Sequence, residues 1–356
     1  AIAVSIACAI PGVFLVLRRM SMMADAITHT VFLGIVLAFF VTEDLNSPLL
    51  LVGATLVGVG TVWLTEMIHN TGLVNEDASI GIIFPLLFSI AIILVSLYSG
   101  NAHLDVDTAL LGEIAFAPFD RWIVNGTDLG PVSLWISLGV ALINLVLVML
   151  FYKELQLSTF DSLLAGLFGF MPAIIHYVLM TMVSLTVVAS FQAVGAILVI
   201  GLMIGPAVIA YLWTDSVKAM LISSIIIGII CAVIGTEVAF TLDVSIAGAI
   251  ATTIGLALLI AVIYTPKTGY IATYRRQRHL RRHYREMMML CHIYTHMNTP
   301  VAATENGIGT IHEHLNWKPD YTHQAASHLK KQGLLYVTNG YYTLTDKGVA
   351  QVKEII

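Results

Sequence analysis

Charge is scarce in this chain. Asp, Glu, Lys and Arg make up only 11% of its 356 residues, whereas soluble domains average about 25%. The three cysteines lie far apart with no CxxC spacing, which argues against a disulfide framework or a zinc ribbon. The sequence has no GxxxxGK(S/T), GxSxG or HExxH motif, so the chain cannot hydrolyse ATP by itself and offers no familiar catalytic constellation. These absences argue against a soluble protein and against an enzyme.

Long apolar runs are abundant instead, and 58% of the residues are hydrophobic. They predict membrane helices, because about 20 apolar residues span the hydrocarbon core of a bilayer. The nearly continuous pair at 173–213 is expected to be broken or re-entrant. The predicted fold class is an all-α polytopic membrane protein with about eight or nine transmembrane helices, followed by a small α+β domain. The expected helices are 1–17, 24–41, 48–68, 79–99, 132–152, 173–190, 193–213, 217–236 and 245–265.

The arginines predict how the helices are oriented. Arg18 and Arg19 and the arginine run 275–285 belong on the cytoplasmic side, because short cytoplasmic loops are enriched in Lys and Arg. The even number of predicted helices between them agrees with this placement. Loops 42–47 and 100–131 then face outward, and loops 69–78 and 153–172 face inward. Because Ala1 already stands in apolar sequence, we also expect that part of the first membrane helix is missing.

Asp25 and His29 are the most informative polar residues in the apolar sequence. Ionisable side chains inside a membrane are costly and usually have a function, and the i, i+4 spacing puts both on one helix face. A carboxylate oxygen and an imidazole nitrogen suit a divalent first-row transition metal. Two ligands are too few for a tight site, but a two-fold axis would double them. The alternative is a buried hydrogen-bonded pair that stabilises helix packing.

The predicted outer loop carries a second group of candidate ligands. His103, Asp105 and Asp107 form the sequence HLDVD, which would suit a site where a cation enters from outside. An ordinary exposed polar loop explains these residues equally well, and it remains the favoured interpretation.

The last part of the chain differs in composition from the rest. Residues 275–356 contain eleven of the seventeen Lys and Arg residues and eight of the twelve histidines. Helices are expected at 283–297, 308–315 and 320–332, the last capped by Asp320 and ended by Gly333. A hairpin is expected at 334–345, split by Asn339-Gly340. This order is typical of a winged helix, so the predicted domains are 1–270 in the membrane, a basic linker helix 271–285 and a winged-helix domain 286–356.

Three functions were weighed for this tail. DNA binding would use Tyr321, Thr322, His323 and Gln324 at the start of the third helix, but residues 318–356 carry only five Lys and Arg against three Asp and Glu. Docking or dimerisation is favoured over DNA, and the arginine run is explained by attraction to anionic membrane lipid. Metal sensing would use histidine pairs, either His292 with His296 or His312 with His314 and Glu313.

The membrane part resembles the permease subunit of metal-ion ABC importers, the family that takes up manganese, zinc and iron. Within it, the family's RRMxxxxDxxxH pattern coincides with Arg18, Arg19, Met20, Asp25 and His29. The tail segment HLKKQGLLYVTNGYYTLTDKG (328–348) is similar to the winged-helix part of iron- and manganese-dependent repressors. The membrane resemblance is carried by VFLVLRRMSMMADAITHTVFLG (13–34), EDASIGIIFPLLFSIAIILVSL (76–97), FYKELQLSTFDSLLAGLFG (151–169) and the stretches 185–212 and 244–269.

The resemblance implies specific partners and roles. It implies a dimer of permease subunits, identical or paralogous, around one path, with cytoplasmic ATPase subunits that use ATP and an extracytoplasmic metal-binding protein. It assigns metal coordination to Asp25 and His29. The ATPase-docking loop is assigned to residues 153–170, through Lys153, Glu154, Phe160, Asp161 and Gly166.

The expected protein is therefore the permease subunit of an ATP-driven importer in the cytoplasmic membrane, with its C-terminal domain in the cytoplasm. It has no covalently bound cofactor, and it carries manganese or zinc, with iron as the third candidate. A permease for metal chelates would need a wider path than a compact Asp/His pair indicates. The alternative function is a membrane-anchored, metal-responsive regulator that acts through the winged helix.

Overall fold

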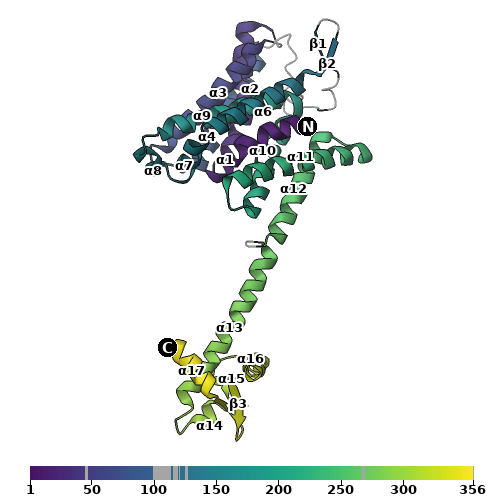
Figure 1. Ribbon diagram of the computed structural model, residues 1–356. Helices are drawn as coiled ribbons and strands as arrows, with labels where there is room; N and C mark the ends of the chain where they lie inside the picture. Colours follow the sequence, from purple (N-terminus) through teal and green to yellow (C-terminus); the bar gives the residue numbers. More distant parts are fainter. Residues whose placement is uncertain are drawn as a thin grey trace. The chain divides into compact units, whose positions relative to one another are not determined.

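The computed structural model describes residues 1–44, 47–98, 114, 119, 121–124, 127–266 and 269–355. The chain divides into two compact units, Ala1–Thr265 and Pro266–Ile356, and each is described here by itself (Figure 1).

The first unit consists mainly of long apolar helices. Eight of them are long and apolar enough to cross a membrane, from α2 to α12, whereas α1 is shorter at 16 residues. The prediction of a polytopic helical membrane protein is confirmed, with helix ends shifted by at most six residues from those expected, the largest shift being at the end of α11. The helices are α1 (Ile2–Leu17), α2 (Ser21–Thr42), α3 (Pro48–His69), α4 (Glu76–Tyr98), α6 (Val132–Leu150), α9 (Pro172–Val194), α10 (Ala196–Trp213), α11 (Val217–Leu242) and α12 (Ile246–Tyr264).

Several helix starts follow from local sequence. The Ser47 hydroxyl accepts a hydrogen bond from the backbone of Leu49, and Pro48 occupies the first turn of α3. Ser216 and Ser245 cap α11 and α12 in the same manner. Serine at the N-cap and proline just after it satisfy or remove backbone donors that a helix start leaves without partners.

The expected break in the 173–213 segment lies at Gly195. Its φ of 77° is a left-handed conformation that glycine adopts without steric cost. Helix α9 ends at Val194 and α10 begins at Ala196, so the segment is two helices that meet at a single glycine.

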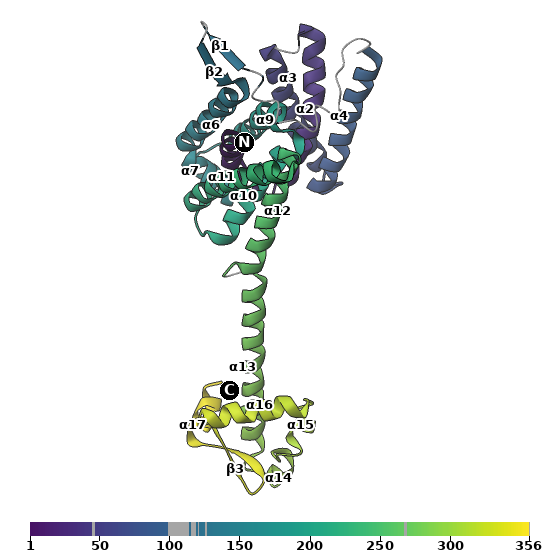
Figure 2. The ribbon, with the colours of Figure 1, turned by 90° about the vertical axis from the view of Figure 1, so that its right-hand side faces the viewer.

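Helix α1 lies at the centre of the first unit, packed against α6, α9, α10 and α11 (Figures 1 and 2). A Cβ added at Gly12 would lie 1.9 Å from the carbonyl oxygen of Met203 on α10, and one at Gly34 of α2 would lie 2.4 Å from the Ala54 Cα on α3. Small residues at such crossings let membrane helices approach closely, where dispersion forces hold them together.

Different loops lie at the two ends of the first unit. At one end, Arg18 and Met20 after α1, Asn70 after α3, Glu76 at the start of α4 and His176 near the start of α9 line one cavity. At the other end, Ala3, Ser133 and Val194 line another. The loops predicted to face inward therefore lie at a common end.

Two short strands precede α6, and the sequence did not predict them. Strands β1 (Arg121–Val124) and β2 (Thr127–Pro131) pair antiparallel. Arg121 forms an ion pair with Asp128 across the hairpin, and the Trp122 ring meets the Trp135 ring edge-on at 6.4 Å between centroids. The prediction treated 100–131 only as a loop.

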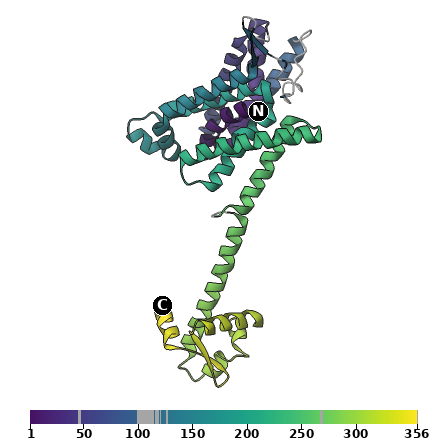
Figure 3. The same cartoon turned by 45° about the vertical axis from the view of Figure 1, so that its right-hand side comes forward.

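The second unit is a helix with a small α+β arrangement at its C-terminal half (Figure 3). A core forms from Met289 and Ile293 of the first helix together with Leu329, Leu344 and Val352. The elements are α13 (Tyr270–His296), α14 (Ala302–Glu305), α15 (Ile311–His314), α16 (Pro319–Lys331), β3 (Leu335–Thr338), β4 (Tyr341–Leu344) and α17 (Asp346–Ile355).

The predicted turn residues of this unit behave as expected. Asn339 and Gly340 both have positive φ, 52° and 86°, as a two-residue hairpin turn of type I′ requires, and they join the antiparallel strands β3 and β4. Gly333, with φ of 72°, follows the end of α16. The hairpin and the helix stop are therefore confirmed.

The helix predictions in this unit were partly right. The basic linker helix expected at 271–285 and the helix expected at 283–297 are both helical and form one continuous helix, α13, because no glycine or proline interrupts them. The helix expected at 308–315 covers only Ile311–His314. Helix α16 is capped by Lys318 with Pro319 in its first turn, so Asp320 lies inside the helix and is not its cap. Helices α14 and α17 were not predicted at all.

Candidate functional site

Asp25 and His29 lie on the same face of α2, as their spacing predicts. The His29 Nε2 is 3.6 Å from the Asp25 Oδ1, and the two side chains are 31% and 43% exposed respectively. The residues between them, Ala26, Ile27 and Thr28, are buried. Within a single chain the Asp25–His29 pair is therefore partly exposed, whereas the rest of this turn is packed in the core.

Two phenylalanines of α4 hold the His29 ring. It stacks on Phe84 with centroids 5.5 Å apart and meets Phe88 edge-on at 5.9 Å. Helix α4 lies at one edge of the first unit beside α2 and α3 (Figure 2). Aromatic contacts of this kind restrict ring rotation, so the imidazole is oriented before any ligand arrives. This contact could not be predicted from spacing along the chain, because it joins residues of two helices.

The depth of the pair along α2 follows from helix geometry. Helix α2 runs from Ser21 to Thr42, and at a rise of about 1.5 Å per residue His29 lies about 4 Å and Asp25 about 10 Å from its midpoint. His29 is thus near the middle of the span, and Asp25 is closer to the end that carries the α1–α2 turn.

A single chain supplies an incomplete metal site here. Among the residues that the structure describes, no third His, Cys, Asp or Glu joins Asp25 and His29 within metal-binding distance. A carboxylate that is half-exposed on an otherwise apolar membrane helix is unfavourable against lipid. The geometry therefore calls for water or another protein chain to cover this face.

A second polar network, which the sequence did not reveal, joins α3 to α9. The His176 Nε2 lies 2.7 Å from Glu66 Oε1, and the Tyr177 hydroxyl donates to Glu66 Oε2 at 2.6 Å. The only earlier signal was that Glu66 is a charged residue within a predicted span. His176 on α9 thus pairs with a carboxylate on the neighbouring helix α3.

Arg18 extends this network to a short helix outside the spans, α7 (Tyr152–Phe160). Its guanidinium lies 3.3 Å from His176 Nδ1 and donates to Thr159 Oγ1 at 3.1 Å and Ser158 Oγ at 3.2 Å. Because arginine only donates, Nδ1 of His176 accepts, and the proton of the neutral ring sits on Nε2 facing Glu66. Arg18 thus ties α7 to the Glu66–His176 contact.

A polar cavity of about 350 Å³ lies beside this network. Met23 of α2, buried in the core, is one of its lining residues, whereas Asp25 two positions later points about 200° away around the helix. In this structure the cavity and the Asp25–His29 pair therefore lie on different faces of α2. The cavity is lined by Arg18, Met20, Met23, Thr65, Glu66, His69, Asn70, Glu76 and His176.

The segment expected to dock an ATPase folds as α7 followed by α8 (Ser162–Leu167). The Asp161 side chain caps α8 by accepting from the Leu164 backbone at 2.9 Å, and Gly166 has open space around its Cα. Lys153 is exposed and Glu154 half-buried. Large apolar side chains stand out here, with Leu163 83% and Leu167 85% exposed, and Phe160, Phe168 and Met171 are exposed as well.

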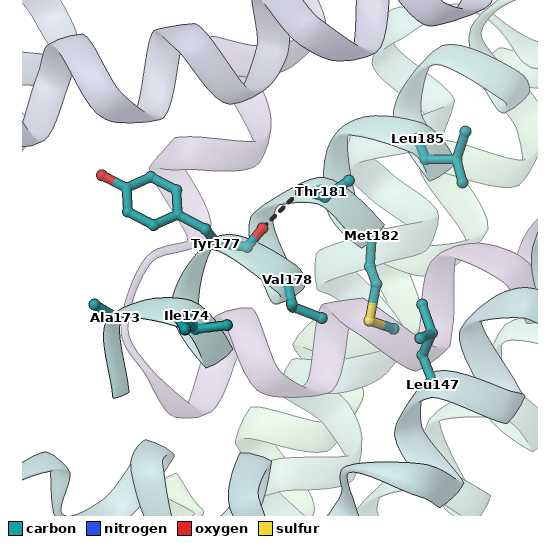
Figure 4. A pocket seen from close by; sticks show the side chains of 8 residues that line it. All are labelled: Leu147, Ala173, Ile174, Tyr177, Val178, Thr181, Met182 and Leu185. Carbon is teal, nitrogen blue, oxygen red and sulfur yellow. Dashed lines mark hydrogen bonds between the residues drawn. The ribbon is translucent and has the colours of Figure 1, made fainter. Parts of the chain in front are cut away.

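An apolar groove of about 400 Å³ runs along α9 opposite Leu147 of α6. Figure 4 shows the Tyr177 ring pointing away from Met182 and Leu147, while the Thr181 hydroxyl donates to the Tyr177 carbonyl of its own helix. The groove has no carboxylate, imidazole or thiol in its lining, so it offers no metal ligands.

The outer-loop candidates His103, Asp105 and Asp107 lie outside the described residues, and their role stays a prediction.

The structure shows which of the tail histidines lie close together. His292 and His296 lie together, with ring centroids 4.8 Å apart. His314 Nδ1 is 3.1 Å from Glu305 Oε2, whereas His312 pairs with Glu313 at 4.0 Å. The expected grouping of His312 with His314 is thus replaced by one of His314 with Glu305, a residue that sequence spacing did not single out.

The DNA-binding candidates at the start of α16 are only partly accessible. His323 and Gln324 are exposed, and the Tyr321 ring lies under the Arg285 guanidinium at 4.5 Å. Thr322 is buried at 3% exposure and cannot contact a base edge.

Comparison with known proteins decides the family of the chain. Residues 1–265 match the ABC 3 transport family. The chain belongs to this family. As an ABC 3 protein it is a membrane permease, a transport component and not an enzyme, as the sequence analysis expected.

Two curated relatives of this ABC 3 chain differ in how much of it they match. The zinc transport system membrane protein TroD of Treponema pallidum (strain Nichols) is 40% identical over 351 residues, covering 98% of this chain and 95% of TroD. The manganese transport system membrane protein MntD of Bacillus subtilis (strain 168) is 45% identical over 268 residues, covering 75% of this chain and 90% of MntD. The TroD match therefore extends through most of the second unit, beyond the family match.

A solved structure supports the fold of the ABC 3 part. PsaBC from Streptococcus pneumoniae in complex with Fab superposes with a TM-score of 0.64 at 30% identity, and the match covers 77% of this chain and 92% of that chain.

Proposed function

We propose that this ABC 3 permease carries a divalent transition-metal ion across the cytoplasmic membrane as one subunit of an ATP-driven importer. The observation that carries the proposal is the Asp25–His29 pair, two metal-ligating side chains held on one open face of a membrane helix, 3.6 Å apart. A pair that is oriented but incomplete can grip an ion and let it leave again, as transport requires.

A second permease subunit, identical or paralogous, completes the site in this proposal. The half-exposed carboxylate needs a polar or protein environment, and a two-fold axis near α2 would supply a second Asp and a second His. Four ligands of mixed oxygen and nitrogen type would then surround one ion.

Energy comes from partner ATPase subunits, since the sequence has no phosphate-binding loop. Helices α7 and α8 present Phe160, Leu163 and Leu167 to the surroundings, and an apolar patch of this kind marks a protein interaction site. We assign the ATPase contact to this patch, with Lys153, Glu154 and Asp161 at its polar margin. Arg18 then links the docking helices to Glu66 and His176.

The ion is manganese or zinc, with iron as the third candidate. Carboxylate and imidazole ligands accept all three, and neither ligand is a thiolate that would favour zinc or copper. The relatives TroD and MntD, whose names specify zinc and manganese transport, support the same pair of ions.

The arginine distribution sets the orientation. Arg18, Arg19 and the arginines of α13 are placed in the cytoplasm, so α7, α8 and the second unit are cytoplasmic and β1–β2 faces outward, where an extracytoplasmic metal-binding protein delivers the ion. The second unit is assigned a winged-helix arrangement, from α13, α15 and α16 followed by the β3–β4 hairpin, with a docking or dimerisation role.

The test is uptake of manganese, zinc and iron in competition by the complete reconstituted importer. Asp25→Ala and His29→Ala should each abolish uptake while the protein stays in the membrane. Deletion of residues 266–356 should leave uptake measurable. The opposite pattern, tolerance of both alanines and failure on deletion, would establish the alternative of a membrane-anchored regulator.

A further inference from the structure

The second unit contains a compact group of metal-ligating side chains. One ligand atom each from His292, His296 and Glu305 lie within 4.8 Å of one another. In the part of the chain that the structure describes, this is the one group of three or more such residues. His292 and Glu305 are mostly buried, at 15% and 26% side-chain exposure, so the group is not a chance meeting of solvated side chains.

The three residues come from two elements that the fold holds against each other. His292 and His296 occupy successive turns of α13, one above the other, and Glu305 ends α14. Asn306, directly after Glu305, is fully buried and donates from its side-chain nitrogen to the Ile293 carbonyl of α13 at 3.3 Å. Glu305 is therefore positioned by backbone packing and not only by its own charge.

The spacing suits an ion after small side-chain rotations. A tetrahedral ion with bonds of about 2.1 Å keeps its ligand atoms about 3.4 Å apart. The His292 Nε2 is 3.7 Å from Glu305 Oε2 and donates to the Glu305 backbone carbonyl at 3.2 Å, a hydrogen bond that an ion would replace. The His292 and His296 rings are 4.8 Å apart at their centroids. Two imidazoles and one carboxylate form a donor set typical of zinc sites that keep a fourth position for water.

His314 has a different part in this group. Its Nδ1 lies 3.1 Å from Glu305 Oε2, the same oxygen that faces the His292 Nε2 at 3.7 Å, so this ion pair holds the carboxylate in place beside His292. Such outer partners of metal ligands fix the ligand geometry and raise affinity. His312, two residues earlier on the same short helix, pairs with Glu313 instead.

We propose that the second unit binds one divalent transition-metal ion through His292, His296 and Glu305, with His314 as the positioning residue of Glu305. Zinc is the preferred ion, because imidazole-rich sites bind it more tightly than manganese or iron(II). The bound ion would tie α13 to α14, because its ligands come from both helices. The proposal does not depend on transport through Asp25 and His29.

The experiment uses the full-length chain in detergent, carrying Asp25→Ala and His29→Ala so that the membrane pair cannot contribute. Equilibrium dialysis against zinc, followed by metal analysis, should show one ion per chain. His292→Gln and Glu305→Gln should each remove that ion, and His314→Gln should weaken binding about 10- to 100-fold. His312→Gln is the matched control and should bind as tightly as the parent.

Spectroscopy of the same variants distinguishes loss of metal coordination from loss of folding. Cobalt(II) bound in place of zinc should give the intense visible absorption of a four-coordinate site in the parent and in His312→Gln, but not in Glu305→Gln. Circular dichroism checks that Glu305→Gln keeps its helices. The proposal is overturned if the parent binds no zinc, if Glu305→Gln retains the ion, or if His312→Gln loses as much affinity as His314→Gln.

Discussion

The two groups of candidate metal ligands in this chain are built differently. Asp25 and His29 lie on one helix, half-exposed, and no described residue of the same chain completes them. His292, His296 and Glu305 come from two packed helices and are mostly enclosed within one unit. A site that needs a second molecule can open when that molecule moves, whereas a site closed within one small domain retains its ion. The first arrangement suits an ion that passes through, and the second suits an ion that stays bound.

The difference between the two groups is tested most directly by the number of metal ions that each group binds. Here we expect the largest effect. In the assembled importer the membrane pair should hold one ion per two permease chains, and the tail group one ion per chain. His29→Ala should remove only the first and abolish uptake, because in a dimer of identical subunits both imidazoles, half of the four ligands, disappear. Glu305→Gln should remove only the second and leave the path intact.

Metal analysis of the purified importer, alongside uptake, measures both quantities. Asp77→Asn, an exposed carboxylate in the first turn of α4, is the control and should change neither. Loss of the tail ion in the His29 variant, or of the membrane ion in the Glu305 variant, would show that the two groups are not independent.

The next largest effect should come from the docking patch. Leu167→Asp places a charge on a side chain that is 85% exposed and that we assign to the ATPase contact. Burying an unpaired carboxylate in an interface costs several kcal/mol, so copurification of the ATPase and uptake should both fall sharply, while zinc binding by the tail is unchanged.

Leu129→Asp is the matched control for this variant. Leu129 is also an exposed leucine, 43% accessible, but it lies on β2, which we place at the outer face. If both variants lost the ATPase to the same degree, the assignment of α7 and α8 would be wrong.

A smaller effect is expected at Arg18, which joins α7 to the membrane helices. Arg18→Lys keeps the positive charge but loses the fork that reaches Ser158, Thr159 and His176 together, since lysine lacks a planar guanidinium. ATP hydrolysis should continue while uptake per ATP falls several-fold. Unchanged coupling in simultaneous ATPase and uptake assays would show that the three contacts only stabilise the fold.

The smallest effect should be confined to the second unit. Gly340→Val forces a β-branched residue into a φ of 86°, which costs about 1–3 kcal/mol. Limited proteolysis should therefore cut the tail faster, with uptake preserved. Gly309→Val is the control, because no atom lies within 4 Å of an added Cβ there and its φ is not positive; it should leave the cleavage rate unchanged.

Features that depend on near neighbours along the chain could be predicted from the sequence alone. The helices of the membrane unit follow from apolar length, because a bilayer leaves an apolar segment few alternatives to a helix. The Asp25–His29 pair follows from i, i+4 spacing, and the hairpin at Asn339-Gly340 follows from the positive φ that both residues tolerate. Each is a local rule that needs no knowledge of the rest of the fold.

Contacts between the surfaces of different helices could be seen only in the tertiary structure. It placed Phe84 and Phe88 against His29, joined Glu66 to His176, and put Glu305 rather than His312 beside the tail histidines. Such contacts join separate helices, and their partners depend on how whole helix surfaces pack, where small residues such as Gly34 allow close approach. Spacing along the chain cannot supply that information, because the energy that selects one packing is shared among many side chains at once.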